Sequence, residues 1–107
     1  MSFKIIPTLA FERELKKLSK RHSSIKTDLS SLIISLKDGS DLGKALGNNC
    51  FKIRMAISSK NKGKSGGARV ITYVKIIDEV IYLISIYDKS DTDTITDEEL
   101  RTRIGEL

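Results

Sequence analysis

The spacing of hydrophobic residues changes once along this chain, from the period of a helix to the period of a strand. Between residues 11 and 36, apolar side chains recur three or four positions apart, as on one face of a helix. They form two stripes: Phe11, Leu15 and Leu18, then Ile25, Leu29, Leu32, Ile33 and Leu36. Thr8 and Ser23 or Ser24 stand where N-caps are expected, and Gly39 where the second helix would end. Two short helices joined by a brief link predict an antiparallel hairpin.

After residue 50 the period becomes two, as in a strand whose faces differ. We expect strands over residues 50–57, 68–76 and 80–87, a tight turn at 77–79 and a Gly-, Ser- and Lys-rich loop at 58–67. The strand at 80–87 is apolar on both faces and is expected inside the sheet. A short strand at 2–6, ended by Pro7, and a last helix opened by the capping box at 96–99 give the order β-α-α-β-β-β-α.

These elements predict an α+β fold. The 107 residues are the size of one domain, so we expect a single domain over residues 1–107. The hairpin must bury its apolar stripe and the sheet must bury one face, so the helices should pack on one side of a small, twisted, mainly antiparallel sheet. The other face would then stay partly open to water, carrying Lys52, Arg54 and Arg69. With Arg69 exposed, its replacement by Ala should alter stability by less than about 0.5 kcal/mol.

Positive charge is concentrated in the middle of the chain. The net charge is +5, and residues 42–77 hold eight Lys and Arg but no Asp or Glu. These eight are Lys44, Lys52, Arg54, Lys60, Lys62, Lys64, Arg69 and Lys75. An acid-free stretch of this kind predicts a polyanion-binding surface, because an ordinary structural surface mixes both signs. A solvated basic face is the alternative interpretation.

Several other kinds of site are excluded. One His and one Cys cannot supply the common zinc or haem frameworks, and His22, after Lys20 and Arg21, is expected to be solvated or to cap a helix. The segment 63–65, Gly-Lys-Ser, has no Gly five positions before its Gly-Lys pair and precedes a strand, so it is not a nucleotide-binding P-loop. No apolar run is long enough for a membrane span or signal peptide. We expect a cytoplasmic protein without a metal, a cofactor or a membrane contact.

Five segments, taken in order, resemble the RelE/ParE superfamily of toxins, most closely its RelE/HigB-like ribonucleases. They are residues 11–18 (Phe-Glu-Arg-Glu-Leu-Lys-Lys-Leu), 50–55 (Cys-Phe-Lys-Ile-Arg-Met), 63–71 (Gly-Lys-Ser-Gly-Gly-Ala-Arg-Val-Ile), 86–91 (Ile-Tyr-Asp-Lys-Ser-Asp) and 95–100 (Ile-Thr-Asp-Glu-Glu-Leu). The resemblance covers nearly the whole chain. The ordered set, with Lys-Ser-Gly-Gly-Ala-Arg-Val-Ile at its centre, is what makes it specific.

The resemblance implies the toxin of a type II toxin–antitoxin system. Such an mRNA interferase enters the A site of the small (30S) ribosomal subunit, cuts the mRNA there and stops translation, and a cognate antitoxin blocks it. The basic sheet residues of the family match Lys52, Arg54 and Arg69, and the basic residue after the last strand matches Lys89, which implies that these four are catalytic. RelE also carries a tyrosine near its C-terminus that stacks on the substrate, and Ile95 stands at that position here.

The chemistry expected of these residues is metal-independent cleavage, in which the 2′-hydroxyl of RNA attacks the adjacent phosphate. Arg and Lys alone can position and stabilise the charge that develops. Arg69 suits a phosphate clamp because its planar fork binds two oxygens, and Lys52 is the candidate base. The remaining candidates for binding RNA or the ribosome are Lys44, Lys60, Lys62, Lys64, Lys75 and Tyr73, the tyrosine by stacking on a base.

Two other functions remain open from the sequence. One is the ParE-like branch of the same fold, which poisons DNA gyrase by binding and cuts nothing. The other is a non-enzymatic domain that binds RNA or the ribosome. The matched cations at positions 52, 54, 69 and 89 favour the nuclease, because a gyrase inhibitor needs no cationic pocket on its sheet.

Overall fold

The fold of this protein is described from a computed structural model that covers residues 2–61, 63–91 and 95–107. The elements are β1 (Lys4–Pro7), α1 (Leu9–Arg21), α2 (Ile25–Leu36), β2 (Lys44–Gly47), β3 (Cys50–Met55), the 3₁₀ turn η1 (Ser58–Lys60), β4 (Ala68–Lys75), β5 (Val80–Asp88) and α3 (Asp97–Gly105). The predicted α+β class and its helical hairpin are confirmed. Lys62 lies outside the described residues.

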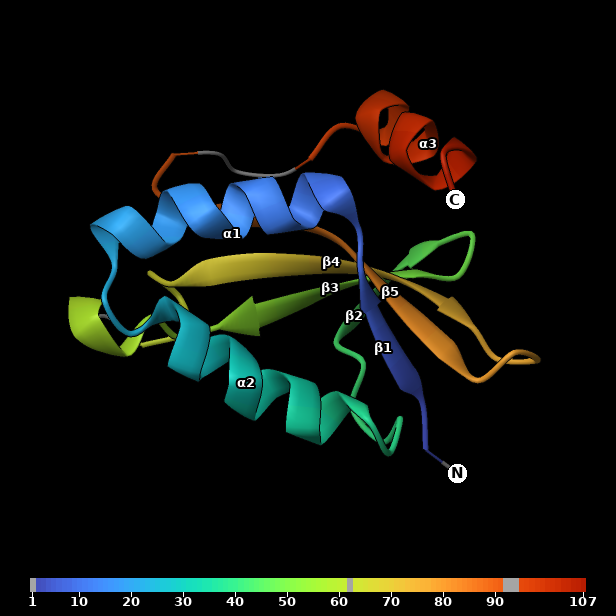
Figure 1. Ribbon diagram of the computed structural model, residues 1–107, viewed down its shortest axis with the longest axis horizontal. Helices are drawn as coiled ribbons and strands as arrows, with labels where there is room; N and C mark the ends of the chain where they lie inside the picture. The colour runs from blue at the N-terminus through green and yellow to red at the C-terminus, as the bar shows by residue number, and fades with distance from the viewer. Residues whose placement is uncertain (1, 62, 92–94) are drawn as a thin grey trace.

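The five strands form one sheet in the order β1-β5-β4-β3-β2 (Figure 1). Strand β1 runs parallel to β5, and the other pairs are antiparallel. As expected, β5 lies inside the sheet. Strand β2 was not predicted, and it exists because Asn48 and Asn49 form a two-residue turn with φ values of 53° and 64°. Asn tolerates this left-handed backbone region better than most residues, which lets the chain reverse and pair again.

Helices α1 and α2 cover one face of the sheet, as the apolar stripes predict (Figure 1). The main core lies between these helices and the sheet. The helices contribute Phe11, Leu18, Ile25, Leu29 and Leu36, and the strands contribute Ile53, Val70, Val74, Ile81, Leu83 and Ile86. The side chain of Thr8 accepts a hydrogen bond from the backbone N of Phe11 and donates one to the carbonyl of Leu83. The predicted N-cap therefore also fixes the start of α1 to β5.

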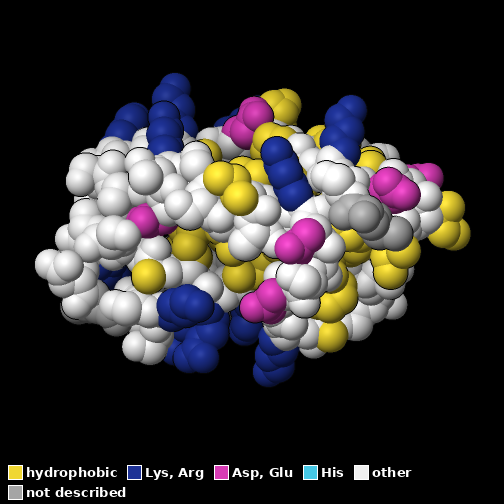
Figure 2. All heavy atoms as spheres, turned by 90° about the horizontal axis from the view of Figure 1, so that it is seen from below, with side chains coloured by type: hydrophobic (Ala, Val, Ile, Leu, Met, Phe, Trp, Pro, Cys, Tyr) yellow, Lys and Arg dark blue, Asp and Glu magenta, His cyan; other side chains and the backbone are white. Residues whose placement is uncertain are grey.

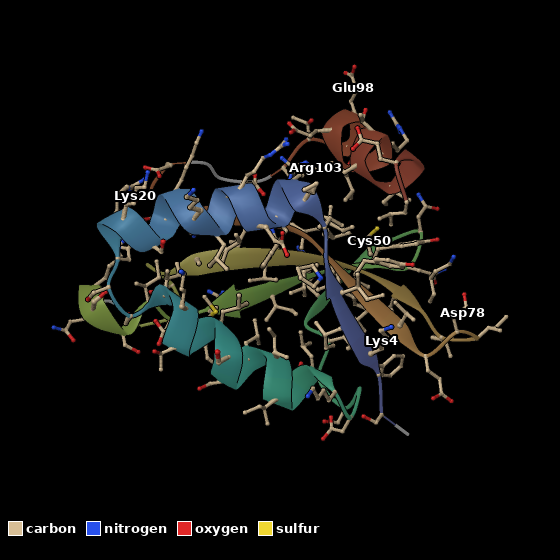
Figure 3. The ribbon with its side chains drawn as sticks, in the orientation of Figure 1. Lys4, Lys20, Cys50, Asp78, Glu98 and Arg103 are labelled. Carbon is tan, nitrogen blue, oxygen red and sulfur yellow. The ribbon has the colours of Figure 1, made fainter. Side chains whose placement is uncertain are left out.

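The opposite face of the sheet is less open than the sequence predicts. Helix α3 lies against it, and a second apolar cluster forms from Leu100 with Cys50, Ile71 and Ile84. The capping box is confirmed, since Thr96 Oγ1 accepts a hydrogen bond from the backbone N of Glu99 at 3.2 Å. Figure 3 places Arg103 between α3 and α1, where its guanidinium donates to the carboxylate of Glu14 at 2.8 and 3.0 Å. This ion pair joins α3 to α1, and the same guanidinium holds α3 on the sheet by donating to the carbonyl of Ile84 on β5 at 2.9 Å.

Candidate functional site

An open groove of about 1100 Å³ runs along the outer edge of β3. Within the described residues, β2 pairs with β3 only as far as Lys52, so residues 53–55 have no neighbouring strand on that side. Six of the lining residues are cations: Lys44, Lys52, Arg54, Lys64, Arg69 and Lys89. Figure 2 shows one group of Lys and Arg side chains at the lower edge of the face that the view presents and others along its upper edge. The groove therefore brings together all four predicted catalytic residues.

Strand register places like charges opposite one another in this groove. Lys44 faces Lys52 across β2 and β3, and Arg54 faces Arg69 across β3 and β4. Like charges that lie directly opposite each other destabilise a sheet, and the effect of one cross-strand pair is typically about 0.2–1 kcal/mol. An anion bound between them would reverse that effect.

The predicted exposure of Arg69 on the open face of the sheet is wrong. The residue is buried, with only 4% of its surface exposed. Its guanidinium donates to three backbone carbonyls, those of Lys64 at 2.9 Å, Ala68 at 3.1 Å and Ser65 at 3.3 Å. Among the described residues it has no carboxylate partner. Burial, with a smaller contribution from the charge of Arg54, lowers the pKa of Arg69.

The loop before β4 supplies those carbonyls, and Gly67 allows it to do so. A Cβ atom at Gly67 would collide with the carbonyl oxygen of Met55 on β3. Only glycine permits this close approach, which brings the backbone at residues 64 and 65 over Arg69. The carbonyl of Gly67 also accepts a hydrogen bond from the backbone N of Lys89 at 3.0 Å. The predicted Gly-, Ser- and Lys-rich loop is thus a structured wall of the groove.

Lys60 does not join the groove as a free cation. Its Nζ donates to the carboxylate of Asp88 at 3.0 and 3.2 Å, and its side chain is 15% exposed. Asp88 also contacts His22 Nε2 at 2.9 Å and Arg21 at 3.5 Å. His22 caps α1 through its backbone, as expected, but its ring is largely buried. Because Asp88 lies outside the acid-free stretch, a count of charges along the sequence does not detect this pairing.

Two further predicted RNA-binding residues lie away from the groove. Lys75 is 3.7 Å from Asp78, which Figure 3 shows at the tip of the β4–β5 turn, far from the loop that precedes β4. Tyr73 stacks on Tyr82, with ring centroids 6.3 Å apart, and packs against the cluster under α3. Neither side chain faces the four matched cations, whereas Lys44 and Lys64 do line the groove.

A second, smaller pocket of about 250 Å³ lies between α1, β5 and α3. Its lining includes Tyr87, Ile95 and the Glu14–Arg103 pair. The hydrogen bonds that Arg103 donates to the carboxylate of Glu14 raise the pKa of Arg103. The hydroxyl of Tyr87 is buried there and has no hydrogen-bond partner within residues 2–61, 63–91 and 95–107. Tyr87 faces Arg69 across β4 and β5, a neighbour that alternation along single strands could not reveal.

No group of three or more His, Cys, Asp or Glu side chains could hold a metal ion in residues 2–61, 63–91 and 95–107. Over the same residues, no helix combines the length and the hydrophobicity that a bilayer span requires.

The fold and the groove together define a small α+β protein whose sheet carries a groove lined by six cations. A family model described as the RelE toxin of the RelE/RelB toxin–antitoxin system matches residues 4–104. The chain therefore belongs to the RelE family: it is the toxin of a type II toxin–antitoxin system and has an antitoxin of the RelB type as its partner. This is a family of endoribonucleases.

Solved structures agree with the fold. The chain is similar to a double mutant of the E. coli toxin RelE in the free state, with 19% identity, a TM-score of 0.63, and coverage of 100% of this chain and 99% of that one. It is also similar to the isolated E. coli RelE toxin, with 19% identity, a TM-score of 0.57 and full coverage of both chains. At this identity the likeness establishes the fold. Among curated proteins, no sequence matches the chain.

Proposed function

We propose that this toxin is a ribosome-dependent endoribonuclease that acts in the cytoplasm. It cuts mRNA in the A site of the small ribosomal subunit, and the 2′-hydroxyl of the message is the nucleophile. The observation that carries the proposal is the buried Arg69, a cation that is held by carbonyl dipoles, faces Arg54 and has no counterion among the described residues. Burying an unpaired charge is unfavourable, and a phosphate in the groove would compensate it.

Each of the four matched cations has a role in this reaction. Lys52, in its neutral amine form, takes the proton of the 2′-hydroxyl, whose oxygen then attacks the adjacent phosphorus. Arg54 and Arg69 hold the phosphate oxygens while charge develops on them, and Lys89 adds a third positive charge from the end of β5. The bond to the 5′-oxygen breaks and that oxygen takes a proton from water, while the proton on Lys52 returns to the solvent. The products are a cyclic 2′,3′-phosphate and a free 5′-hydroxyl.

The groove lacks a strong acid–base pair of its own. Asp28 is one of its two carboxylates, and Ser58 and Ser24 hydrogen-bond to it. Burial alone would raise the pKa of Asp28, but these hydrogen bonds lower it below its usual value, which makes the carboxylate a weak base. His22 faces Asp88 instead of the groove. Alignment of the message by the ribosome must then supply much of the rate.

The test compares one RNA in two states. Purified toxin should leave the naked RNA nearly intact and cut the same RNA when it is the message on programmed ribosomes. The Arg69→Lys variant, which keeps the charge but loses the fork, should cut poorly in both states. Efficient cleavage of naked RNA would contradict the ribosome dependence. Intact message, together with a DNA damage response on induction, would instead favour gyrase poisoning.

A further inference from the structure

A single buried carboxylate joins three segments behind the groove. Asp88 ends β5 and is 1% exposed. Lys60 reaches it from η1, His22 from the end of α1, and Ser90 from the following turn. Ser90 donates both its backbone N at 2.9 Å and its hydroxyl at 2.7 Å to the same oxygen, Oδ1. The proposed cleavage chemistry uses none of these contacts.

The turn that Asp88 fixes is the turn that carries Lys89. The backbone N of Lys89 donates to Gly67, and the backbone N of Asp91 donates to the carbonyl of Asp88, each at 3.0 Å. Asp88 shares the register position of Ala68 and faces the helices. Since neighbouring side chains in a strand point to opposite faces, the next residue is directed to the Arg69 side, where Lys89 lines the groove.

The same carboxylate also fixes the start of the loop before β4. Lys60 is the last residue of η1, and the loop that follows ends with the carbonyls that hold Arg69. Asp88 therefore lies behind both walls of the groove without touching the space that a phosphate would occupy. It is absent from the groove lining, whereas Lys64 and Lys89 are part of it.

We propose that Asp88 is a positioning residue for cleavage: its carboxylate fixes the turn that presents Lys89 to the phosphate. This inference rests on the proposed function. Burial alone would raise the pKa of Asp88, but hydrogen bonds from Ser90, Lys60 and His22 hold it well below its usual range. The group is thus ionised at physiological pH and acts as a fixed anchor, not as an acid or base.

The test is a double-mutant cycle on programmed ribosomes. Asp88→Asn should lower kcat of the folded protein by about ten- to hundredfold, because a displacement on the order of 1 Å costs this much, and should leave KM within about twofold. In a Lys89→Ala background the same substitution should cost less than about twofold, since its effect passes through Lys89. Asp91→Asn is the matched control, because this exposed carboxylate of the same turn pairs with Arg21 but does not hold Ser90. It should cleave like the parent.

Ser90→Ala provides a second variant if Asp88→Asn does not fold. It removes one donor to Asp88 without uncovering a buried charge, and it should show the same dependence on Lys89 with a smaller loss. The proposal is overturned if the effects of position 88 and position 89 are additive, if unfolding accounts for the whole loss, or if Asp91→Asn loses as much activity.

Failure of the proposed function has a different signature. If the parent toxin leaves the message on programmed ribosomes intact, the cleavage proposal fails. The double-mutant cycle is then measured with the affinity for a short single-stranded RNA instead of the cleavage rate. Asp88→Asn must then weaken binding in the parent and not in the Lys89→Ala background. Equal weakening in both backgrounds, or none in either, would overturn the role of Asp88.

Discussion

Asp88 and Arg69 are two buried charges at the same end of the sheet, one on each face. Asp88 faces the helices and receives Lys60, His22 and both donors of Ser90. Arg69 lines the groove, and in the part of the chain that the structure describes its guanidinium donates to backbone carbonyls of its own loop and strand. The first charge is fully compensated inside the protein. The second has carbonyl dipoles but, among the described residues, no carboxylate partner, and this difference is the basis of the proposal that Arg69 binds a phosphate.

The largest effect should be on stability, and it should fall on Asp88. Replacing it with Ala leaves Lys60 and His22 facing each other without their anion, which should cost about 3–5 kcal/mol in the free energy of unfolding. Arg69→Ala should cost about 1–3 kcal/mol, because it leaves carbonyls without donors and creates no unpaired charge. Urea denaturation of both variants measures the two values. Equal losses would remove the distinction between the two sites.

The order should reverse when activity is measured. Arg69→Lys retains a positive charge but cannot bind two phosphate oxygens with a planar fork. Cleavage should fall about a hundredfold, equivalent to about 2.7 kcal/mol in the transition state. Rates on programmed ribosomes, corrected for folded protein by the same denaturation curves, provide the measurement. A folded Arg69→Lys variant that cuts like the parent would exclude Arg69 from the site.

A smaller effect concerns acid. The pKa of Asp88 is lower in the folded chain than the value of about 3.9 expected when the chain is unfolded. The ionised carboxylate therefore makes its full contribution to the free energy of unfolding above about pH 4. This contribution decreases as the pH falls, by about 1–2 kcal/mol between pH 4 and pH 2. The Asp88→Asn variant should show a flatter acid limb in thermal unfolding between about pH 4 and pH 2. A limb as steep as the parent's would assign the acid sensitivity to other carboxylates.

The smallest effect should come from inorganic phosphate. If the groove binds this anion, phosphate at three times its Kd should stabilise the parent by about 0.8 kcal/mol. Arg54→Ala should abolish the increase, because it removes the exposed partner of Arg69, whereas Asp91→Asn should keep it. Thermal shifts at constant ionic strength, with chloride as the matched salt, separate binding from screening. A phosphate effect that survives in Arg54→Ala would place the anion elsewhere.

The sequence predicted most elements of the fold because their signals are local. Helical stripes, alternating strands and two capping residues depend on neighbours a few positions apart, and the structure confirms both Thr8 and Thr96 as caps. Strand β2 was not predicted because all four of its residues are exposed, so its sequence shows no alternation of apolar and polar residues. The Asn48-Asn49 pair that turns the chain into β3 was the available signal.

The site was predictable in its chemistry but not in its burial. The acid-free stretch and the alternation on β3 identified Lys52 and Arg54, which the structure brings together with Arg69 and Lys89. Two facts depended on distant segments. Lys60 and Asp88 are 28 positions apart, and the carbonyls over Arg69 arrive only because Gly67 lets the loop approach β3. Neither contact can be predicted from the residues that neighbour it in the sequence.

The parallel pairing of β1 with β5 determines when during synthesis the toxin can become complete. Lys4 pairs with Val80, 76 positions later, so the first strand emerges from the ribosome long before its only neighbour. At a synthesis rate of roughly 5–20 residues per second, β1 waits about 4–15 seconds for β5. Lys89 emerges later still. The groove of a nascent chain is therefore incomplete until both β5 and Lys89 have emerged.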